Sequence, residues 1–315
     1  MIERALVTGG AGFIGANLVD RLIDDGADVL VIDDLSSGKL DRLSRAREAH
    51  HVQVHQIDIR DERLPEVLAR FGPDVVFHLA AQTDTERSFQ SPDFDASVNV
   101  VGTVNVLAAA IASGVGRVVF ASSGGAVFGK ANKIPTPERS RPVPLSPYGV
   151  SKLVADEYLR YFHRKNGLHY VSLGCADVYG PRQASHEEAG IVAFLTRTLL
   201  SGERPLIFGD GTQERDFVFV EDVTDAFVRA AEYDGGVYLN IGTGVGTSVN
   251  ALFDKLCELT GKRVRPLYKG ARDGEMRYSV LDVAAAERTL GWKPWTSLDE
   301  GLALTVEHFV SEVAG

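Results

Sequence analysis

The sequence predicts an α/β protein whose core is a doubly wound, mostly parallel sheet, joined to a smaller second lobe. Short apolar runs recur at residues 5–7, 29–32, 52–57, 75–77, 118–120 and 170–173. They are continuous rather than alternating, which is typical of parallel strands covered by helices on both faces. Between the first two runs, apolar residues recur at the spacing of a helix, at Ile14, Leu18, Val19 and Leu22. This alternation indicates βαβ units.

The first apolar run leads directly into a glycine-rich turn, Thr8-Gly9-Gly10-Ala11-Gly12-Phe13-Ile14-Gly15, which opens the first helix. Glycines at three-residue intervals let the backbone approach a pyrophosphate at the positive end of that helix. The second run ends in Asp33, 18 residues beyond Gly15. A carboxylate there accepts hydrogen bonds from a ribose diol and repels a 2′-phosphate. The turn therefore predicts a Rossmann site for NAD rather than NADP, with Asp58, after the third run, near the adenine edge.

A second motif, residues 146–152, predicts acid–base chemistry at the start of a helix. Ser146 is a suitable N-cap, and the proline after it suits the first helical position. Tyr148 and Lys152 then share one helix face. The Lys152 ammonium and a cationic nicotinamide both favour the phenolate, so Tyr148 becomes a usable acid or base. The fifth run ends in Ser122-Ser123, at the sheet edge where such folds bind their ligands.

Chain length and punctuation predict two lobes. The 315 residues exceed the usual size of one hydrophobic core. From about Pro181 the alternation loosens, and Pro and Gly residues become frequent. We therefore predict an NAD-binding Rossmann domain over residues 1–180, to which the chain returns around 215–245. Residues 181–315 are expected to form mainly a C-terminal α/β lobe that binds the substrate.

Two other polar features have structural interpretations. The glycine cluster at 242–246 lies between a strand and a helix, and a phosphate-binding loop is one interpretation of it. The favoured interpretation is a turn before a helix capped by Thr247 or Ser248, because no charged residue is arranged around it. His78 precedes a small-residue run, and we expect it to be a packed, hydrogen-bonded strand residue. Neither feature is expected to take part in catalysis.

Composition argues against several classes of function. With 33 basic and 43 acidic residues, the net charge is −10, whereas nucleic-acid binding needs clustered Lys and Arg. Cys175 and Cys257 are too few for a disulfide framework or a thiolate metal site, and suit a reducing compartment. The histidines at 50, 51 and 55 lack an accompanying carboxylate or thiol pattern, so no metal is expected. The first strand starts almost at Met1, and no apolar run is expected to approach the ~20 residues that span a bilayer. We expect a cytoplasmic protein without a membrane partner.

Taken together, these motifs resemble those of the extended short-chain dehydrogenase/reductases over nearly the whole chain. The shared features are the glycine turn, Asp33, His78-Leu79-Ala80-Ala81, Asn99, Ser122-Ser123, Tyr148 and Lys152. Within that group the chain is similar to the UDP-hexose 4-epimerases. This narrower similarity rests on three motifs, at residues 178–183, 209–216 and 272–275.

The resemblance implies which residues contact each ligand. For NAD these are Gly9, Gly12, Phe13, Ile14, Gly15, Asp33, Asp34, Ser37, Gly38, Asp58, Ile59, Leu79, Ala80, Ala81, Gln82, Asn99, Ser122, Tyr148, Lys152, Cys175 and Val178. For a UDP-sugar they are Ser123, Asp177, Val192, Phe208, Gln213, Arg215, Arg272 and Ser279. Arg215 and Arg272 are expected to hold the diphosphate, because bidentate guanidinium groups suit it. Residues near Phe208 are expected to pack on uracil.

Several positions depart from the family pattern or set its specificity. Gly124 stands where Ser or Thr is frequent, so the hydroxyl of the proton relay must come from one of the two serines before it. Asp177 stands where Asn is frequent, and an ionised carboxylate cannot donate a hydrogen bond to a phosphate. The small residues at 174–176 are expected to widen the sugar pocket. Ser279 occupies the position that gates the C2 substituent, and its small side chain leaves space for an N-acetyl group.

The resemblance implies an epimerase that inverts C4 of UDP-glucose and UDP-galactose, or of their N-acetyl forms. Tyr148 removes the proton of the C4 hydroxyl, with Ser122 or Ser123 bridging the two, while the C4 hydride passes to NAD. The 4-keto sugar then turns about its diphosphate, and the hydride returns to the opposite face. The two helices around residues 98–113 and 148–164 carry apolar stripes wider than one face. They predict a two-fold, four-helix dimer interface, with burial under the second lobe as the alternative.

Three alternative functions stay open. A UDP-glucuronate 4-epimerase would need a cation for the C6 carboxylate, and Arg182 or Arg197 is a candidate. A sugar-nucleotide dehydratase or decarboxylase is less favoured, because Ser123-Gly124 stands where dehydratases of this group carry Asp-Glu. A non-catalytic NAD sensor is the alternative outside enzymes. Such proteins commonly lose the Tyr or the Lys, and both are present here.

Overall fold

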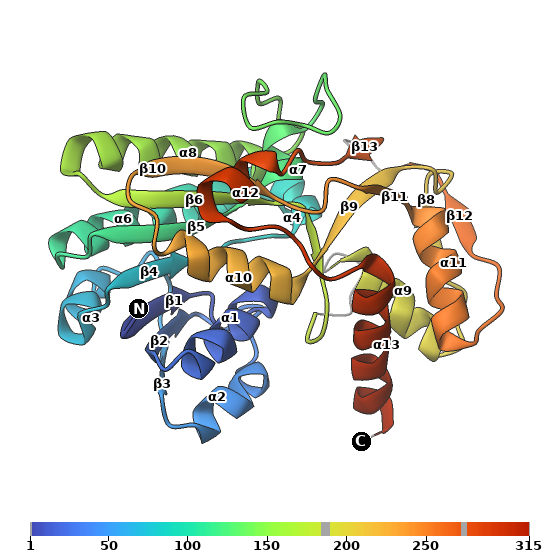
Figure 1. Ribbon diagram of the computed structural model, residues 1–315, viewed down its shortest axis with the longest axis horizontal. Helices are drawn as coiled ribbons and strands as arrows, with labels where there is room; N and C mark the ends of the chain where they lie inside the picture. Colours follow the sequence, from blue (N-terminus) through green and yellow to red (C-terminus); the bar gives the residue numbers. More distant parts are fainter. Residues whose placement is uncertain (1, 184–189, 272–275, 315) are drawn as a thin grey trace.

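The computed structural model describes residues 2–183, 190–271 and 276–314. Within these ranges the main sheet has seven parallel strands in the order β10-β6-β5-β4-β1-β2-β3 (Figure 1). The strands are β1 (Arg4–Thr8), β2 (Asp28–Asp33), β3 (Val52–Gln56), β4 (Val75–His78), β5 (Arg117–Ser123), β6 (His169–Cys175) and β10 (Gly236–Ile241). The strand order reverses between β1 and β4, which is the topological switch point of a doubly wound sheet. The predicted fold class is confirmed.

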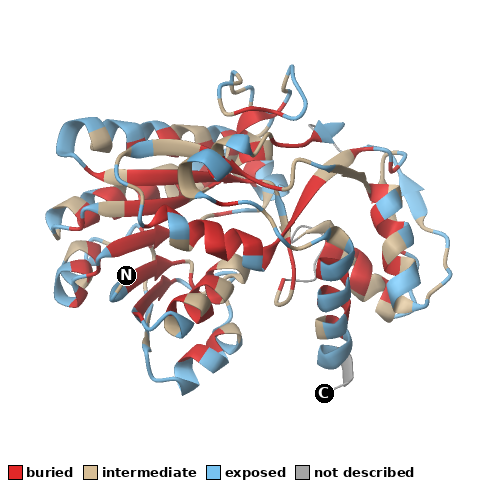
Figure 2. Ribbon diagram, in the orientation of Figure 1, coloured by how far each residue is buried: buried red, intermediate tan, exposed pale blue. Residues whose placement is uncertain are grey.

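Helices cover both faces of this sheet, because neighbouring residues of each strand point to opposite sides. Ala5 and Val7 of β1 belong to the core under α1 (Phe13–Asp24), α10 (Val220–Ala230) and α12 (Ala284–Leu290). Leu6 belongs to the core under α3 (Leu64–Phe71), α6 (Thr103–Ala112) and α8 (Pro147–Asn166). Figure 2 shows most strands of the main sheet buried between these layers and the outer helix faces exposed, whereas the edge strand β3 is only partly covered.

Short helices fill the connections around the carboxyl edge of the sheet. They are the 3-10 helix η1 (Leu40–Leu43), α2 (Ser44–Glu48), α4 (Thr85–Gln90), α5 (Pro92–Ala96), the π-helical segment η2 (Ser97–Gly102) and α7 (Gly124–Phe128). α5, η2 and α6 follow one another without a break and pack against α8. This arrangement places the loop after β4 beside the start of α8.

The helical stretch Pro92–Ala112 contradicts the expectation that no segment approaches the length of a membrane span. It is the one stretch in the described part of the chain that is long and apolar enough, with 21 residues and a mean hydropathy of 1.5. However, its Asp95 and Asn99 are buried and hydrogen-bonded to each other, and 44% of the apolar window is buried inside the protein. Buried polar side chains that are hydrogen-bonded to each other are typical of a helix packed within a folded protein.

The second lobe has a small core of its own. β7 (Asp177–Tyr179), β9 (Glu214–Phe219), β11 (Gly246–Ser248) and β13 (Tyr278–Ser279) form one sheet, and β8 (Leu206–Phe208) pairs with β12 (Leu267–Lys269). α9 (Ile191–Leu200), α11 (Val249–Thr260) and α13 (Leu298–Ala314) pack around them. β10, although it follows part of this lobe in sequence, pairs with β6 in the main sheet. The chain therefore passes between the lobes more than once.

Three local predictions are confirmed. The Ser146 Oγ accepts a hydrogen bond from the Gly149 N–H at 3.1 Å and caps α8. The Ser248 Oγ caps α11 in the same way, through the Ala251 N–H at 3.1 Å. His78 is buried in β4, where its ring nitrogens lie 2.7 Å from the Thr8 Oγ1 and 2.9 Å from the Thr103 Oγ1.

The glycine cluster at 242–246 differs from its prediction in one respect, because a charged residue does lie at its centre. The Asp216 carboxylate accepts hydrogen bonds from the Thr243 N–H, the Thr243 Oγ1 and the Gly244 N–H. These N–H groups are already satisfied, so the cluster is a turn folded around a buried acid rather than a phosphate loop.

Candidate active site

The glycine turn connects β1 to α1 at the switch point. Gly9 has a φ of +71°, and an added Cβ would lie 2.6 Å from the Ala80 backbone nitrogen. An added Cβ on Gly15 would lie 2.1 Å from the Gly9 carbonyl oxygen. Gly12 is different, because its nearest neighbour would be the same oxygen at 3.1 Å. The packing of the fold therefore requires glycine at 9 and 15, whereas Gly12 keeps the outer surface of the turn open.

The start of α1 fits the pyrophosphate of NAD. Gly12 is the N-cap, no side chain caps the helix, and no acidic residue stands in its first turn. The first N–H groups of a helix have no partner within the helix and carry partial positive charge. A bare helix end beside a glycine without a side chain is the geometry that lets a backbone contact a diphosphate directly.

Asp33 lies buried at the end of β2 beside this turn. One carboxylate oxygen accepts from the Ala11 N–H and the other from the Leu35 N–H, both at 2.9 Å. Burial raises the pKa of Asp33, while the two N–H donors lower it. The residue expected to receive the ribose diol thus also fixes the shape of the glycine turn.

Two predicted NAD-contacting residues support the loop after β4. The Asn99 Oδ1 accepts from the Gln82 N–H, and its Nδ2 donates to the Gln82 carbonyl oxygen, both at 2.8 Å. Asp95, which the sequence reasoning missed, accepts from the side-chain amides of both residues at 3.0 Å. It also accepts from the Ser151 Oγ of α8 at 2.6 Å. The only signal in the sequence was the i, i+4 spacing of Asp95 and Asn99.

Tyr148, Lys152 and Ser123 come together at the carboxyl edge of the sheet. The Lys152 Nζ donates to the Ala121 carbonyl oxygen at 2.8 Å and lies 5.8 Å from the centre of the Tyr148 ring. Burial lowers the pKa of Lys152 to about 8. Burial raises the pKa of Tyr148, and a hydrogen bond with the Ser123 side chain acts in the opposite direction. The site therefore holds a phenol, a hydroxyl and an ammonium in one cluster.

The two serines of β5 point to different surroundings. Ser123 contacts Tyr148, whereas the Ser122 Oγ is buried and donates to the Asp156 carboxylate at 2.9 Å. Gly124 packs closely, because an added Cβ would lie 2.5 Å from the Leu281 side chain. The hydroxyl available to Tyr148 is that of Ser123.

A cavity of about 440 Å³ lies between this edge and the second lobe. The main sheet and α8 contribute Ser123, Tyr148 and Cys175, and the second lobe contributes many of the other lining residues, among them Phe208, Gln213, Arg215 and Ser279. The volume is typical of a small-molecule site. The Arg215 Nη1 is held by the Glu214 and Met276 carbonyl oxygens at 2.9 and 2.8 Å. Burial raises the pKa of Asp177, and the nearby Arg215 lowers it.

Some predicted substrate contacts lie elsewhere. The Val192 side chain is buried in the core of the second lobe, while Ile191 and Phe194 of the same helix line the cavity. Gly174 does not widen the pocket. An added Cβ there would lie 2.1 Å from the Tyr238 hydroxyl, so the small residue makes room for that ring. Arg272 lies outside the described residues.

Three charged residues proposed from sequence already have partners. Asp58 is paired with Arg60, with a shortest separation of 2.5 Å, and this hydrogen bond lowers its pKa. Arg182 is paired with the buried Asp20 at 2.5 Å, and Arg197 is paired with Glu312. Neither arginine lines the cavity.

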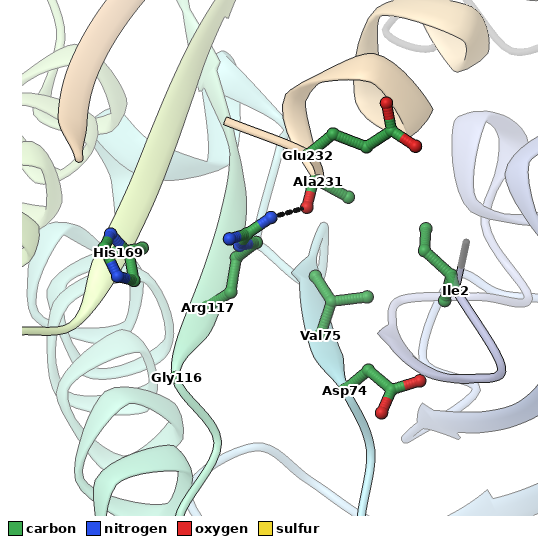
Figure 3. Close-up of a pocket in the computed structure, with 8 residues that line it drawn as sticks. All are labelled: Ile2, Asp74, Val75, Gly116, Arg117, His169, Ala231 and Glu232. Atoms are coloured by element: carbon green, nitrogen blue, oxygen red, sulfur yellow. Dashed lines mark hydrogen bonds between the residues drawn. The ribbon is translucent and has the colours of Figure 1, made fainter. Parts of the chain in front are cut away.

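A second hollow, of about 490 Å³, lies at the opposite, amino-terminal edge of the sheet (Figure 3). Its Arg117 donates to the Ala231 carbonyl oxygen and is paired with Asp234 at 2.5 Å. Ligands of open α/β sheets bind at the carboxyl ends of the strands, so the position argues against an active site here. In the described ranges, no three His, Cys, Asp or Glu side chains are arranged to hold a metal ion.

Comparisons with known proteins agree with this geometry. Residues 5–242 match the sequence profile of a family described as the NAD dependent epimerase/dehydratase family. A UDP-glucose 4-epimerase of Mycolicibacterium smegmatis is 46% identical over 307 residues, which cover 97% of this chain and 98% of the relative.

Two solved structures are similar along their whole length. The UDP-glucose 4-epimerase of Thermotoga maritima, solved with UDP-glucose, has a TM-score of 0.95 and 45% identity, covering 98% of this chain and 99% of that one. The UDP-N-acetylglucosamine 4-epimerase of Methanobrevibacter ruminantium, solved with UDP-N-acetylmuramic acid, has a TM-score of 0.94 and 33% identity, with the same coverage.

Proposed function

Because this chain belongs to the NAD-dependent epimerase/dehydratase family, we propose that it is an NAD-dependent isomerase that inverts C4 of a UDP-hexose. The observation that carries the proposal is the cluster of Tyr148, Lys152 and Ser123, which faces a cavity that Arg215 enters from the second lobe. The cofactor is NAD, in keeping with the family and with the open glycine turn beside Asp33.

The side chains of the cluster divide the proton chemistry between them. Bound NAD supplies the acceptor of the C4 hydride and, since the same hydride returns, also its donor. Tyr148, as the phenolate, takes the proton of the C4 hydroxyl and gives it back to the C4 oxygen when the hydride returns, and the Ser123 hydroxyl orients that oxygen. Burial raises the pKa of Tyr148 and so disfavours its phenolate. The positive charge of the Lys152 ammonium acts in the opposite direction and stabilises the phenolate. We propose that Arg215 and Arg272 retain the diphosphate while the 4-keto sugar turns.

Small residues on one wall support acceptance of both hexoses and N-acetylhexosamines. An added Cβ on Gly125 would lie 2.7 Å from the Ser279 Oγ, so both side chains must be small for the wall to keep its shape. Ser279 also lines the cavity. UDP-glucose and UDP-N-acetylglucosamine are therefore both proposed substrates.

The alternatives are less well supported. Charged residues that line the cavity within the described part of the chain are the acids Asp84, Glu86 and Asp177 and the cation Arg215. A uronate would add another carboxylate to this acidic surrounding without Arg182 or Arg197 to meet it. A dehydratase would need an acid where Gly124 packs under Leu281, and a non-catalytic sensor would not need the acid–base cluster.

We also propose that the enzyme is a cytoplasmic homodimer. Large apolar side chains on η2 and the outer face of α8 are exposed, namely Val101, Val150 and Tyr161. η2 and α8 pack against each other, so these side chains extend over adjacent elements. A second copy related by a two-fold axis would cover them.

Tyr148→Phe tests the reaction. Removing the phenol oxygen should lower interconversion on the order of a hundredfold to ten-thousandfold, the usual contribution of a general acid–base group. The purified variant should still contain NAD, and Tyr158→Phe on the exposed face of the same helix is the matched control. Products from UDP-glucose, UDP-N-acetylglucosamine and UDP-glucuronate should be resolved by mass and stereochemistry. Full activity of Tyr148→Phe, or loss of water or carbon dioxide from the substrate, would contradict the proposal.

A further inference from the structure

A buried carboxylate lies directly beneath the acid–base cluster. Asp156 follows Lys152 by four residues on α8, so the two side chains share a helix face. Each is only 3% exposed. One Asp156 oxygen accepts from the Ser122 Oγ of β5 at 2.9 Å, and the other accepts from the Ser172 Oγ of β6. A single carboxylate thus ties the helix of Tyr148 to the two strands that end at Ser123 and Cys175.

The charges of Lys152 and Asp156 depend on each other. Burial raises the pKa of Asp156 to about 6, while its hydrogen bonds and Lys152 lower it. Burial lowers the pKa of Lys152 to about 8, and Asp156 is the largest influence in the opposite direction. At neutral pH both groups are therefore mostly charged. Without the Asp156 carboxylate, less electrostatic attraction would offset the cost of burying the charged Lys152 ammonium.

Among the residues that the structure describes, few other charged groups lie around Lys152 and Asp156. The titratable groups described near Lys152, besides Asp156, come from four elements: Tyr148 of α8, Asp95 of α5, Cys175 of β6 and His78 of β4. Burial raises the pKa of Cys175 to about 12 and lowers that of His78 to about 3, so both are neutral. Asp95 is the second carboxylate, with three hydrogen-bond donors of its own. Around Asp156, the remaining described groups are Arg160, Tyr170 and Tyr238.

We propose that Asp156 is a positioning residue for the acid–base pair: its carboxylate, one helical turn from Lys152, is the anionic counterpart of that ammonium and fixes α8 against the strand of Ser123. The inference rests on the proposed function, since the charge of Lys152 matters for catalysis only if Tyr148 is the acid–base group. Asp156 acts through Lys152 and Ser122, not on the substrate itself.

Asp156→Asn removes the charge and nearly preserves the shape. Lys152 then loses its proton at lower pH, so the alkaline limb of kcat should move down by about one pH unit, the size of a nearby-charge effect. The Tyr148 phenolate loses stabilisation, so its absorbance titration, obtained as the difference from Tyr148→Phe, should move to higher pH. Both measurements are made on enzyme that contains NAD.

Asp222→Asn is the matched control, because Asp222 is equally buried and is held by the Thr296 N–H and hydroxyl outside the site. It should lower the melting temperature without moving either pH curve. An alkaline limb and a phenol titration that both stay at the wild-type pH in Asp156→Asn would overturn the inference.

Ser172→Ala tests the positioning role of Asp156 if the Asp156→Asn variant does not fold. The variant keeps the carboxylate but removes a donor that favours its charged form, so the Asp156 pKa rises. Activity should then fall at a higher pH on the acid limb, and an acid limb at the wild-type position would overturn the inference. Wild-type enzyme that interconverts no UDP-hexose would instead refute the proposed function, and the phenol titration would still test the pairing of Asp156 with Lys152.

Discussion

At the scale of single residues, Asp33 combines two tasks in one carboxylate. Both of its oxygens accept backbone N–H groups, one from the glycine turn and one from the loop after β2. Each oxygen has a second lone pair, which remains suited to a ribose hydroxyl. The same residue can thus shape the pyrophosphate site and select NAD.

Asp33→Asn should weaken NAD binding. The amide has a single acceptor oxygen, so its NH₂ group would face either the Ala11 or the Leu35 N–H. The ribose diol also loses its hydrogen bonds to a charged acceptor, which are worth about 1.5–3 kcal/mol, and each 1.4 kcal/mol is about tenfold in affinity. NAD retention after dialysis should fall by roughly ten- to a hundredfold on this basis. Asp28→Asn, at the exposed start of the same strand, is the control, and equal retention in the two variants would contradict the dual role of Asp33.

Residues joined by local spacing were predictable, whereas residues joined by tertiary contacts were not. Tyr148 and Lys152 were found because four residues separate them on one helix. The choice of Ser123 over Ser122 needed the structure, because strand alternation sends the two hydroxyls to opposite sides. Asp156 was missed because a helical acid looks like any surface acid until its burial is known.

At the scale of elements, the glycine turn separates what the fold requires from what the ligand requires. Gly15→Ala should destabilise the protein, because its Cβ would lie 2.1 Å from the Gly9 carbonyl oxygen. Overpacking of this kind costs about 1–3 kcal/mol, which differential scanning calorimetry would detect as a lower melting temperature.

Gly12→Ala should fold more nearly normally, because the nearest contact of its Cβ is 3.1 Å. Its methyl group would instead occupy the surface where the diphosphate approaches, so the loss should appear in NAD affinity. The comparison of the two variants is the test. If Gly12→Ala lost stability as much as Gly15→Ala and bound NAD normally, the turn would have no role in binding the diphosphate.

The strands likewise differ in how far the local sequence predicts them. The six apolar runs became β1 to β6, and all of these strands except the edge strand β3 are largely buried, which leaves a strong pattern. The pairing of β10 with β6 joins segments that are far apart in sequence. The strands of the second lobe, such as β7 with three residues, are too short to show a period. The π-helical segment η2 also left no sequence signal.

At the scale of the whole molecule, the active site exists only where the two lobes meet. The acid–base cluster belongs to the main sheet and α8, and Arg215 belongs to β9 of the second lobe. The sugar turns between two hydride transfers. Its diphosphate must therefore be held by one lobe while its reacting carbon faces the other. The cavity between the lobes provides this separation.

The dimer is the last prediction, and it concerns a surface that the second lobe leaves uncovered. Val101 is 58% exposed, Val150 48% and Tyr161 50%. Burial under the second lobe, the alternative from sequence, is therefore excluded for these side chains within one copy of the described chain. Val150→Glu would bring two charges near the two-fold axis, and desolvating an unpaired charge costs several kcal/mol.

Light scattering after size-exclusion chromatography should show a wild-type dimer and a Val150→Glu monomer. Val310→Glu is the matched control, since Val310 is 47% exposed on α13, away from this face. It should remain dimeric. A monomeric wild type, or a Val150→Glu variant that stays dimeric, would show that η2 and α8 do not form the interface. The monomeric variant should keep its NAD, because the glycine turn and the acid–base cluster are each completed within one chain.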